Sequence, residues 1–176
     1  MRDLEAAAAG DVITRVVSSP AETEAVGEAV GRNLDPGEVL LLVGDLGAGK
    51  TTFVRGLARG LGVAFGVKSP SFAIHLRYPG RLPLDHLDLY RLANPRDLAE
   101  LGLEDVLGRD GVTVVEWGER LGDRAPATAV VVRFEDLGDD RRRLIVEGPS
   151  ALLLRIRAAG GWEEPAIGGG EESLSP

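Results

Sequence analysis

Four residues with fixed spacing give this chain its clearest chemical signal. Gly44, Gly49, Lys50 and Thr51 lie in the stretch GDLGAGKTTF, which fits the pattern G-x-x-x-x-G-K-[ST] without a gap. In such a loop, glycines let backbone N–H groups point at phosphate oxygens, lysine adds a positive charge, and the threonine hydroxyl suits a magnesium ion. The pattern therefore predicts a nucleoside triphosphate site formed by Gly44, Asp45, Leu46, Gly47, Ala48, Gly49, Lys50, Thr51 and Thr52.

The flanking sequence supplies the strand and the helix that such a loop needs. GEVLLLVG (37–44) is a short apolar run typical of a buried strand, and KTTFVRGLARGLG (50–62) has apolar residues at the four-residue spacing of a helix. A helix that begins near Lys50 directs the positive end of its dipole at the loop. A glycine-rich turn that binds nothing is disfavoured, because strand, loop and helix occur in the required order.

The rest of the pattern predicts an α/β fold of the P-loop NTPase-like kind, a mixed and partly parallel sheet flanked by helices. We expect an ATPase domain over residues 1–159 and a disordered acidic tail over 160–176, in which Trp162 is the one residue that could dock. The remaining expected strands are 11–19, a hairpin of 72–78 with 82–90, 111–119, and a second hairpin of 127–135 with 141–148, and the expected helices are 20–33 and 94–108.

Composition excludes several kinds of chemistry and partner. The 176 residues contain no cysteine, so neither a disulfide nor a thiolate site is possible. The formal net charge is −8, and an acidic chain does not wrap nucleic acid by bulk electrostatics, so any contact with RNA is expected to be indirect. No apolar run approaches the ~20 residues of a membrane span, and no signal peptide is recognisable, so no membrane partner and a cytoplasmic location are expected.

A magnesium-bound phosphate site also needs a carboxylate, normally from an acid at the end of a buried strand. The chain offers two: Asp88 lies in PLDHLDLYRL and Glu116 lies in VTVVEWGE. The pattern favours Glu116 because its strand is the cleaner apolar run. An ordinary surface acid is the alternative interpretation of each.

Four linked stretches carry a resemblance to a known family. GDLGAGKTTF is followed by VKSPSF (67–72), HLDLYRL (86–92) and VEWGE (115–119). Together they resemble the TsaE family, the ATPase component of the bacterial machinery that makes threonylcarbamoyladenosine in tRNA. The similarity runs from about residue 11 to residue 148.

The resemblance implies ATP and Mg²⁺ as cofactors and a role for each matching residue. Lys50 and Thr51 would contact the phosphates and the magnesium ion, and both acids would belong to the site. The implied catalytic residues are Lys50, Asp88 and Glu116, and the implied metal ligands are Thr51, Asp88 and Glu116. Ser69 and Ser71 fall in a switch-like segment that usually reads Ser-Pro-Thr, so Ser71 keeps the hydroxyl of the usual threonine but loses its methyl group.

Other residues near these motifs have two interpretations each. Trp117 either packs near the nucleotide or a partner, or is a core tryptophan. Tyr90 and Arg91 either face a partner or anchor the next helix. His86 is interpreted as a packed strand residue rather than a proton shuttle.

The function implied by the resemblance is ATP hydrolysis that cycles a partner complex and is required for the tRNA modification. The expected partners are proteins of the threonylcarbamoyl-transferase complex, with tRNA contacted only indirectly. The alternative is a small-molecule kinase, which would need an acceptor pocket with several convergent arginines, and no Arg-rich lid segment follows the phosphate loop. A GTP-operated switch is disfavoured because no Asn-Lys-x-Asp motif occurs.

Overall fold

A seven-stranded sheet forms the centre of the computed structural model, which describes residues 11–64, 66–92, 98 and 102–163. The strand order is β1-β7-β6-β2-β5-β4-β3. The strands are β1 Asp11–Val17, β2 Val39–Val43, β3 His75–Tyr78, β4 Leu84–Asp88, β5 Val112–Glu116, β6 Val130–Gly138 and β7 Arg141–Gly148. The helices are α1 Pro20–Arg32, α2 Lys50–Gly60 and α4 Ser150–Ala158, with short 3₁₀ segments η2 Leu103–Asp105 and η3 Gly118–Arg124.

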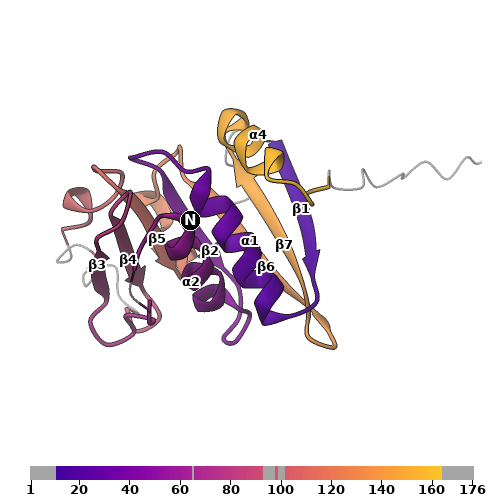
Figure 1. Cartoon of the computed structure of the whole chain (residues 1–176). Coiled ribbons are helices and arrows are strands. Elements are labelled where there is room, and N and C mark those ends of the chain that lie inside the picture. Colours follow the sequence, from indigo (N-terminus) through magenta and orange to yellow (C-terminus); the bar gives the residue numbers. More distant parts are fainter. Residues whose placement is uncertain (1–10, 65, 93–97, 99–101, 164–176) are drawn as a thin grey trace, which may run out of the picture.

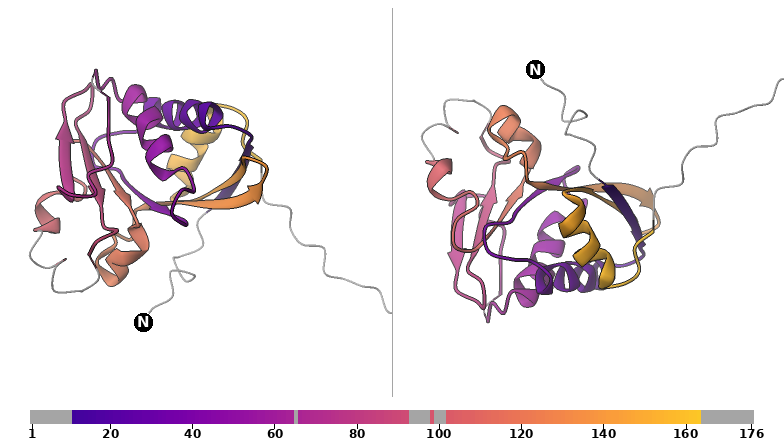
Figure 2. Two further views of the ribbon diagram at one scale, coloured as in Figure 1. Left: turned by 90° about the horizontal axis from the view of Figure 1, so that it is seen from below. Right: turned by 90° about the horizontal axis from the view of Figure 1, so that it is seen from above.

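Helices α1, α2 and α4 lie on one face of the twisted sheet (Figures 1 and 2). Between them and the strands is the larger hydrophobic cluster, which includes Phe53 and Leu57 from α2 and Leu40 and Leu42 from β2. The alternate β2 residue Leu41 packs into a second cluster on the other face. Because β2 is apolar on both faces, it takes a central place in the sheet.

Parallel pairing holds the middle of the sheet together. Strand β2 pairs in parallel with both β5 and β6, and β4 pairs in parallel with β5. The outer pairs β1–β7, β6–β7 and β3–β4 are antiparallel. The expected mixed, partly parallel sheet flanked by helices is therefore confirmed, and none of the described helices is both long and apolar enough to cross a membrane.

Most of the predicted elements are present, and both predicted hairpins form. Helix α4 was missed, although Leu152, Leu153 and Ile156 are buried on it. Most of the predicted helix 94–108 lies outside the described residues, and the part that is described contains the 3₁₀ turn η2.

The C-terminal segment remains part of the fold as far as Glu163. Trp162 is buried in the main cluster, and Glu163 forms an antiparallel bridge with Thr14 of β1. The predicted disorder of the acidic tail otherwise concerns residues 164–176, which lie outside the described residues.

Helices α1 and α2 pack with their backbones in contact at glycines. A methyl group added at Gly56 of α2 would lie 1.9 Å from the carbonyl oxygen of Glu24, and one added at Gly27 of α1 would lie 2.2 Å from that of Phe53. Arg59 of α2 also pairs with Glu24 of α1 at 2.7 Å. Since α2 begins at the phosphate loop, this close packing fixes the helix that carries the loop.

We expect Gly56→Ala to destabilise the protein. Replacing glycine by alanine inside a helix normally gains about 1 kcal/mol, but here the new methyl group has no space, and overpacking should cost about 2–3 kcal/mol instead. Urea unfolding of the variant measures the difference. Gly66→Ala is the control, because a methyl group there meets nothing within 4 Å; a Gly56→Ala variant as stable as the wild type would contradict the close packing.

Candidate functional site

The predicted phosphate loop connects β2 to α2 and is shaped by glycines with positive φ. Gly44, Gly47 and Gly49 have φ values of 150°, 80° and 105°, and residues with a Cβ atom rarely adopt such backbone angles. At Gly44 the loop also approaches β6, since an added methyl group would lie 3.0 Å from the carbonyl oxygen of Phe134. Gly49 is the N-cap of α2, so the free N–H groups of the first helical turn lie beside the loop.

Lys50 is folded into this loop. It is only 5% exposed, and its Nζ donates to the carbonyl oxygens of Gly44 (2.5 Å) and Asp45 (2.8 Å). The ammonium group also lies 4.0 Å from the ring centroid of Trp117. Burial lowers the pKa of Lys50, and the carboxylates of Glu116, Glu119, Asp88 and Asp45 oppose that shift. A positive charge is thus held at the mouth of the loop, where an anion would gain most from it.

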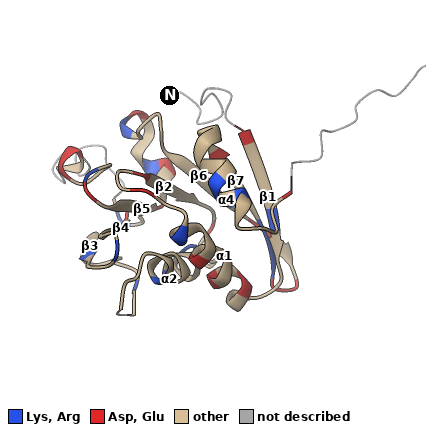
Figure 3. Ribbon diagram, turned by 45° about the horizontal axis from the view of Figure 1, so that its top comes forward, with Lys and Arg blue, Asp and Glu red and all other residues tan. Residues whose placement is uncertain are grey.

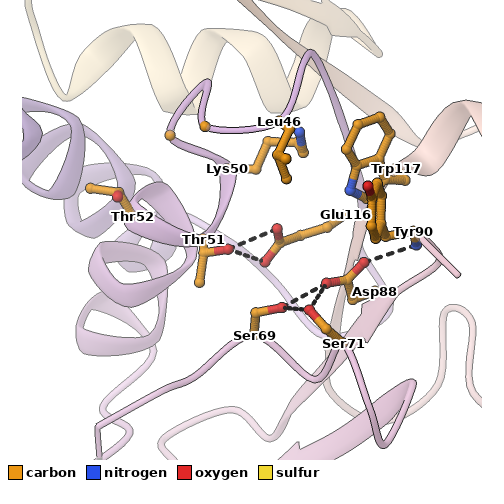
Figure 4. A pocket seen from close by; sticks show the side chains of 12 residues that line it. Leu46, Lys50, Thr51, Thr52, Ser69, Ser71, Asp88, Tyr90, Glu116 and Trp117 are labelled. Carbon is orange, nitrogen blue, oxygen red and sulfur yellow. Dashed lines mark hydrogen bonds between the residues drawn. The ribbon is translucent and has the colours of Figure 1, made fainter. Parts of the chain in front are cut away.

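Glu116 meets the loop at the next residue, Thr51. The Thr51 hydroxyl lies 2.9 Å from each carboxylate oxygen of Glu116, as Figure 4 shows. On the inner side, Nε2 of His86 lies 2.9 Å from Oε1 of the same carboxylate. Glu116 is 3% exposed, so its charge lies inside the protein and is held by hydrogen bonds from two elements.

Asp88 lies one strand away from Glu116 and has its own set of donors. Its Oδ2 accepts from the hydroxyls of Ser69 (2.6 Å) and Ser71 (2.8 Å), and its Oδ1 accepts from the backbone N–H of Tyr90 (2.9 Å). The switch-like segment therefore contacts the site through Asp88. Ser71 provides its hydroxyl at this point.

Two aromatic rings flank the acids. Trp117 adopts a left-handed backbone conformation with φ 60°, and its ring lies 5.1 Å from that of Tyr90. Both rings are partly accessible, and Trp117 lines the cleft while it also packs against the second hydrophobic cluster, so it combines the two interpretations. Sequence reasoning missed Arg120, whose Nη1 donates to the carbonyl oxygens of Leu89, Tyr90 and Leu92. No sequence motif indicates this contact, which exists only because η3 folds back on the end of β4.

These groups surround one cleft of about 300 Å³. Its lining consists of Leu46, Gly47, Gly49, Lys50, Thr51, Thr52, Ser69, Ser71, Asp88, Tyr90, Glu116 and Trp117. Of the other predicted loop residues, Gly44 and Asp45 bind Lys50 through their carbonyl groups, and Ala48 packs into the core. The structure therefore brings all the predicted catalytic and metal-ligating residues to one place.

The oxygen atoms in the cleft are of the kind that Mg²⁺ prefers. Among the described residues, no group of three or more His, Asp or Glu side chains is arranged to hold a metal ion by itself. Magnesium is commonly bound by one or two carboxylates together with the phosphates of a nucleotide. The hydroxyl of Thr51 and the carboxylate of Glu116 fit that arrangement, with Asp88 close enough to line the same cleft.

The fold and the loop define a P-loop NTPase-like α/β protein. The model of the family described as threonylcarbamoyl adenosine biosynthesis protein TsaE matches residues 17–144, which is more than half of the chain. The chain therefore belongs to the TsaE family.

Individual relatives are similar over most of their length. A tRNA threonylcarbamoyladenosine biosynthesis protein TsaE from Treponema pallidum is 42% identical over 74% of this chain and 97% of its own. The protein of the same name from Bacillus subtilis is 40% identical over 72% of this chain and 79% of its own. A crystal structure of YdiB from Bacillus subtilis superposes with a TM-score of 0.74 and 32% identity, and the match covers 85% of this chain and 96% of that one.

Ser69 and Ser71 both donate to Oδ2 of Asp88, so we expect their contributions to the free energy of unfolding to be coupled. Either Ser69→Ala or Ser71→Ala leaves one hydroxyl on Oδ2, so each should lower the free energy of unfolding by about 1 kcal/mol. The double variant leaves that oxygen without either donor and should cost more than the sum of the two. Urea unfolding measures all three, with exposed Ser150→Ala as the control; strictly additive losses would contradict a shared role at Asp88.

Proposed function

We propose that this protein binds ATP with Mg²⁺ in the cleft and hydrolyses it. Hydrolysis would cycle the partner complex that makes threonylcarbamoyladenosine in tRNA. The observation that carries the proposal is the convergence of Lys50, Thr51, Asp88 and Glu116, from α2, β4 and β5, on one cleft of about 300 Å³. Membership of the TsaE family supports the link to this tRNA modification.

The phosphate loop would bind the triphosphate. Backbone N–H groups at the start of α2 and the Lys50 ammonium supply positive charge at the same end of the cleft. To reach the phosphates, Lys50 would exchange its bonds to loop carbonyls for charge-assisted bonds to phosphate oxygens, which are stronger. The Trp117 ring would then lie beside the Lys50 ammonium group, whose charge is paired with a phosphate oxygen.

The two acids, which lie side by side on neighbouring strands, would have different roles at the bound phosphates. Glu116, which is hydrogen-bonded to Thr51, would be the acid nearer the metal ion. A bound magnesium ion would neutralise the charge that develops on the phosphates during hydrolysis. Asp88 would hold Ser69 and Ser71 of the switch-like segment in place, so that the segment responds to what occupies the cleft.

The lining of the cleft supports hydrolysis over transfer to a small molecule. A kinase of this size would need several arginines around its acceptor, and among the described residues none lines the cleft. The arginines of the 141–143 run lie instead on β7, where Arg142 and Arg143 pair with Asp136 and Glu135 of β6.

The rim of the cleft supports a protein partner. Leu46 is 76% exposed and Phe72 is 86% exposed, and both belong to segments that line the cleft. Figure 3 shows Lys and Arg on several elements with Asp and Glu between them. This distribution favours contact with proteins rather than with the tRNA itself.

Lys50→Ala tests the phosphate loop. We expect ATP affinity, measured by calorimetry, to fall by about 10²-fold or more, because charge held at a phosphate site is typically worth about 3 kcal/mol. Arg55→Ala is the matched control, since it removes the same charge from an exposed position of α2 outside the cleft. Equal affinities in the two variants, with both folded, would refute the phosphate-loop assignment.

Asp88→Asn and Glu116→Gln test the two acids while keeping their shape. Each variant should bind ATP nearly normally, because the loop and Lys50 provide most of the phosphate attraction. Turnover stimulated by the partner proteins should fall by about 10²-fold or more in each. Exposed Asp123→Asn controls for the loss of one negative charge. Wild-type turnover in Glu116→Gln would remove that residue from the mechanism.

A further inference from the structure

His86 is a buried histidine in contact with an acid of the cleft. It is 0% exposed, and its Nε2 lies 2.9 Å from Oε1 of Glu116. It precedes Asp88 by two residues on β4, so both side chains point to the α2 face of the sheet. His86 does not line the cleft, and it reaches the cleft only through Glu116.

The other ring nitrogen determines which tautomer is present. Nδ1 of His86 is buried and has no hydrogen-bond partner among the described residues. A hydrogen on Nδ1 would be a buried unpaired N–H, which is rarer in proteins than an unpaired acceptor. The imidazole therefore carries its hydrogen on Nε2 and donates it to Oε1 of Glu116.

We propose that His86 is a positioning residue for Glu116. Its Nε2–H holds the inner oxygen of the carboxylate, so that the side facing Thr51 keeps a fixed orientation toward the cleft. Without this donor, Oε1 would keep only the Thr51 hydroxyl, which it shares with Oε2, and the carboxylate would be free to rotate about that single contact. This inference rests on the proposed function, in which Glu116 acts during ATP turnover.

The chain contains a second, more exposed histidine–carboxylate contact for comparison. Its second histidine, His75, makes the same type of contact, with Nε2 at 2.8 Å from Oδ1 of Asp85. Asp85 neighbours His86 on β4 and therefore points to the opposite face of the sheet. Neither His75 nor Asp85 lines the cleft, so a variant of His75 removes an equivalent bond away from the site.

The tautomer can be measured without any nucleotide. With only two histidines, long-range ¹H–¹⁵N spectra of protein labelled at histidine separate both rings. We expect the spectra to place the hydrogen of the His86 ring on Nε2, and we expect Glu116→Gln to shift the His86 signals while leaving those of His75 in place. An Nδ1–H form of His86, or His86 signals that do not respond to Glu116→Gln, would overturn the proposal.

Three variants test the consequence for turnover. His86→Leu removes the donor and keeps an apolar side chain of similar size, His86→Gln restores an N–H donor, and His75→Gln is the control. Loss of a group that orients a functional side chain typically costs about 10- to 100-fold. We expect His86→Leu to lower kcat by that factor and to leave the Kd for ATP nearly unchanged. His86→Gln should recover most of the lost kcat. His75→Gln should have the kcat of the wild type.

The outcomes separate this inference from the proposed function. If Glu116→Gln is inactive while His86→Leu turns over like the wild type, the positioning role is wrong and the proposed function stands. If Glu116→Gln turns over like the wild type, the role of Glu116 itself is wrong. If His86→Leu does not fold, His86→Gln and the histidine spectra test the positioning role instead. A folded His86→Gln variant with as little turnover as Glu116→Gln would overturn the role of the N–H donor.

Discussion

The alignment of three parallel strands is the constraint on which the site depends. Leu42 of β2 pairs with Glu116 of β5, and Glu116 pairs in turn with Asp88 of β4. The phosphate loop therefore starts at the same end of the sheet as the two acids, directly beside them. Because side chains alternate between the faces of a strand, a slip of one residue would turn either acid away from the loop.

Close packing of α1 against α2 holds the other end of the phosphate loop in place. The strands alone fix where the loop starts, whereas α2 fixes where it ends. Glycines 27 and 31 of α1 and 56 and 60 of α2 let the two backbones touch, and at each of them an added methyl group would lie within 2.3 Å of a backbone oxygen of the partner helix. A rigid helix therefore anchors the far end of a loop that is itself built from glycines.

Local patterns made much of this fold and site predictable. The loop motif, the apolar runs and the Pro-Gly turn of the first hairpin are all short-range signals, so the elements around Lys50 and Glu116 were expected in the right order. Both acids were also found as candidates because each ends a strand. Which donor each acid meets could not be predicted, since Thr51 reaches Glu116, and Ser69 reaches Asp88, only through the register of the folded sheet.

The features that the sequence did not predict depend on contacts between segments that are distant along the chain. Arg120 binds carbonyl groups at the end of β4, and Trp162 joins the core through the bridge of Glu163 to Thr14. No sequence pattern indicated the Arg120 contact, and the sequence marked Trp162 as able to dock without indicating where. Helix α4 was missed for a related reason, since its apolar residues follow a strand pair directly and form only a short run.

The proposed function requires that the cleft bind a metal ion together with a nucleotide and not by itself. Thr51 and Glu116 offer too few ligands to retain the ion alone, whereas nucleotide phosphates would complete its coordination. The direct measurement is electron paramagnetic resonance of Mn²⁺ added in place of Mg²⁺, with and without ATP, and with ATP in the absence of protein as the reference. We expect a protein-bound Mn²⁺ signal that appears only when ATP is present. A signal of equal strength without ATP, or no protein-bound signal in its presence, would contradict joint binding of the metal ion and the nucleotide.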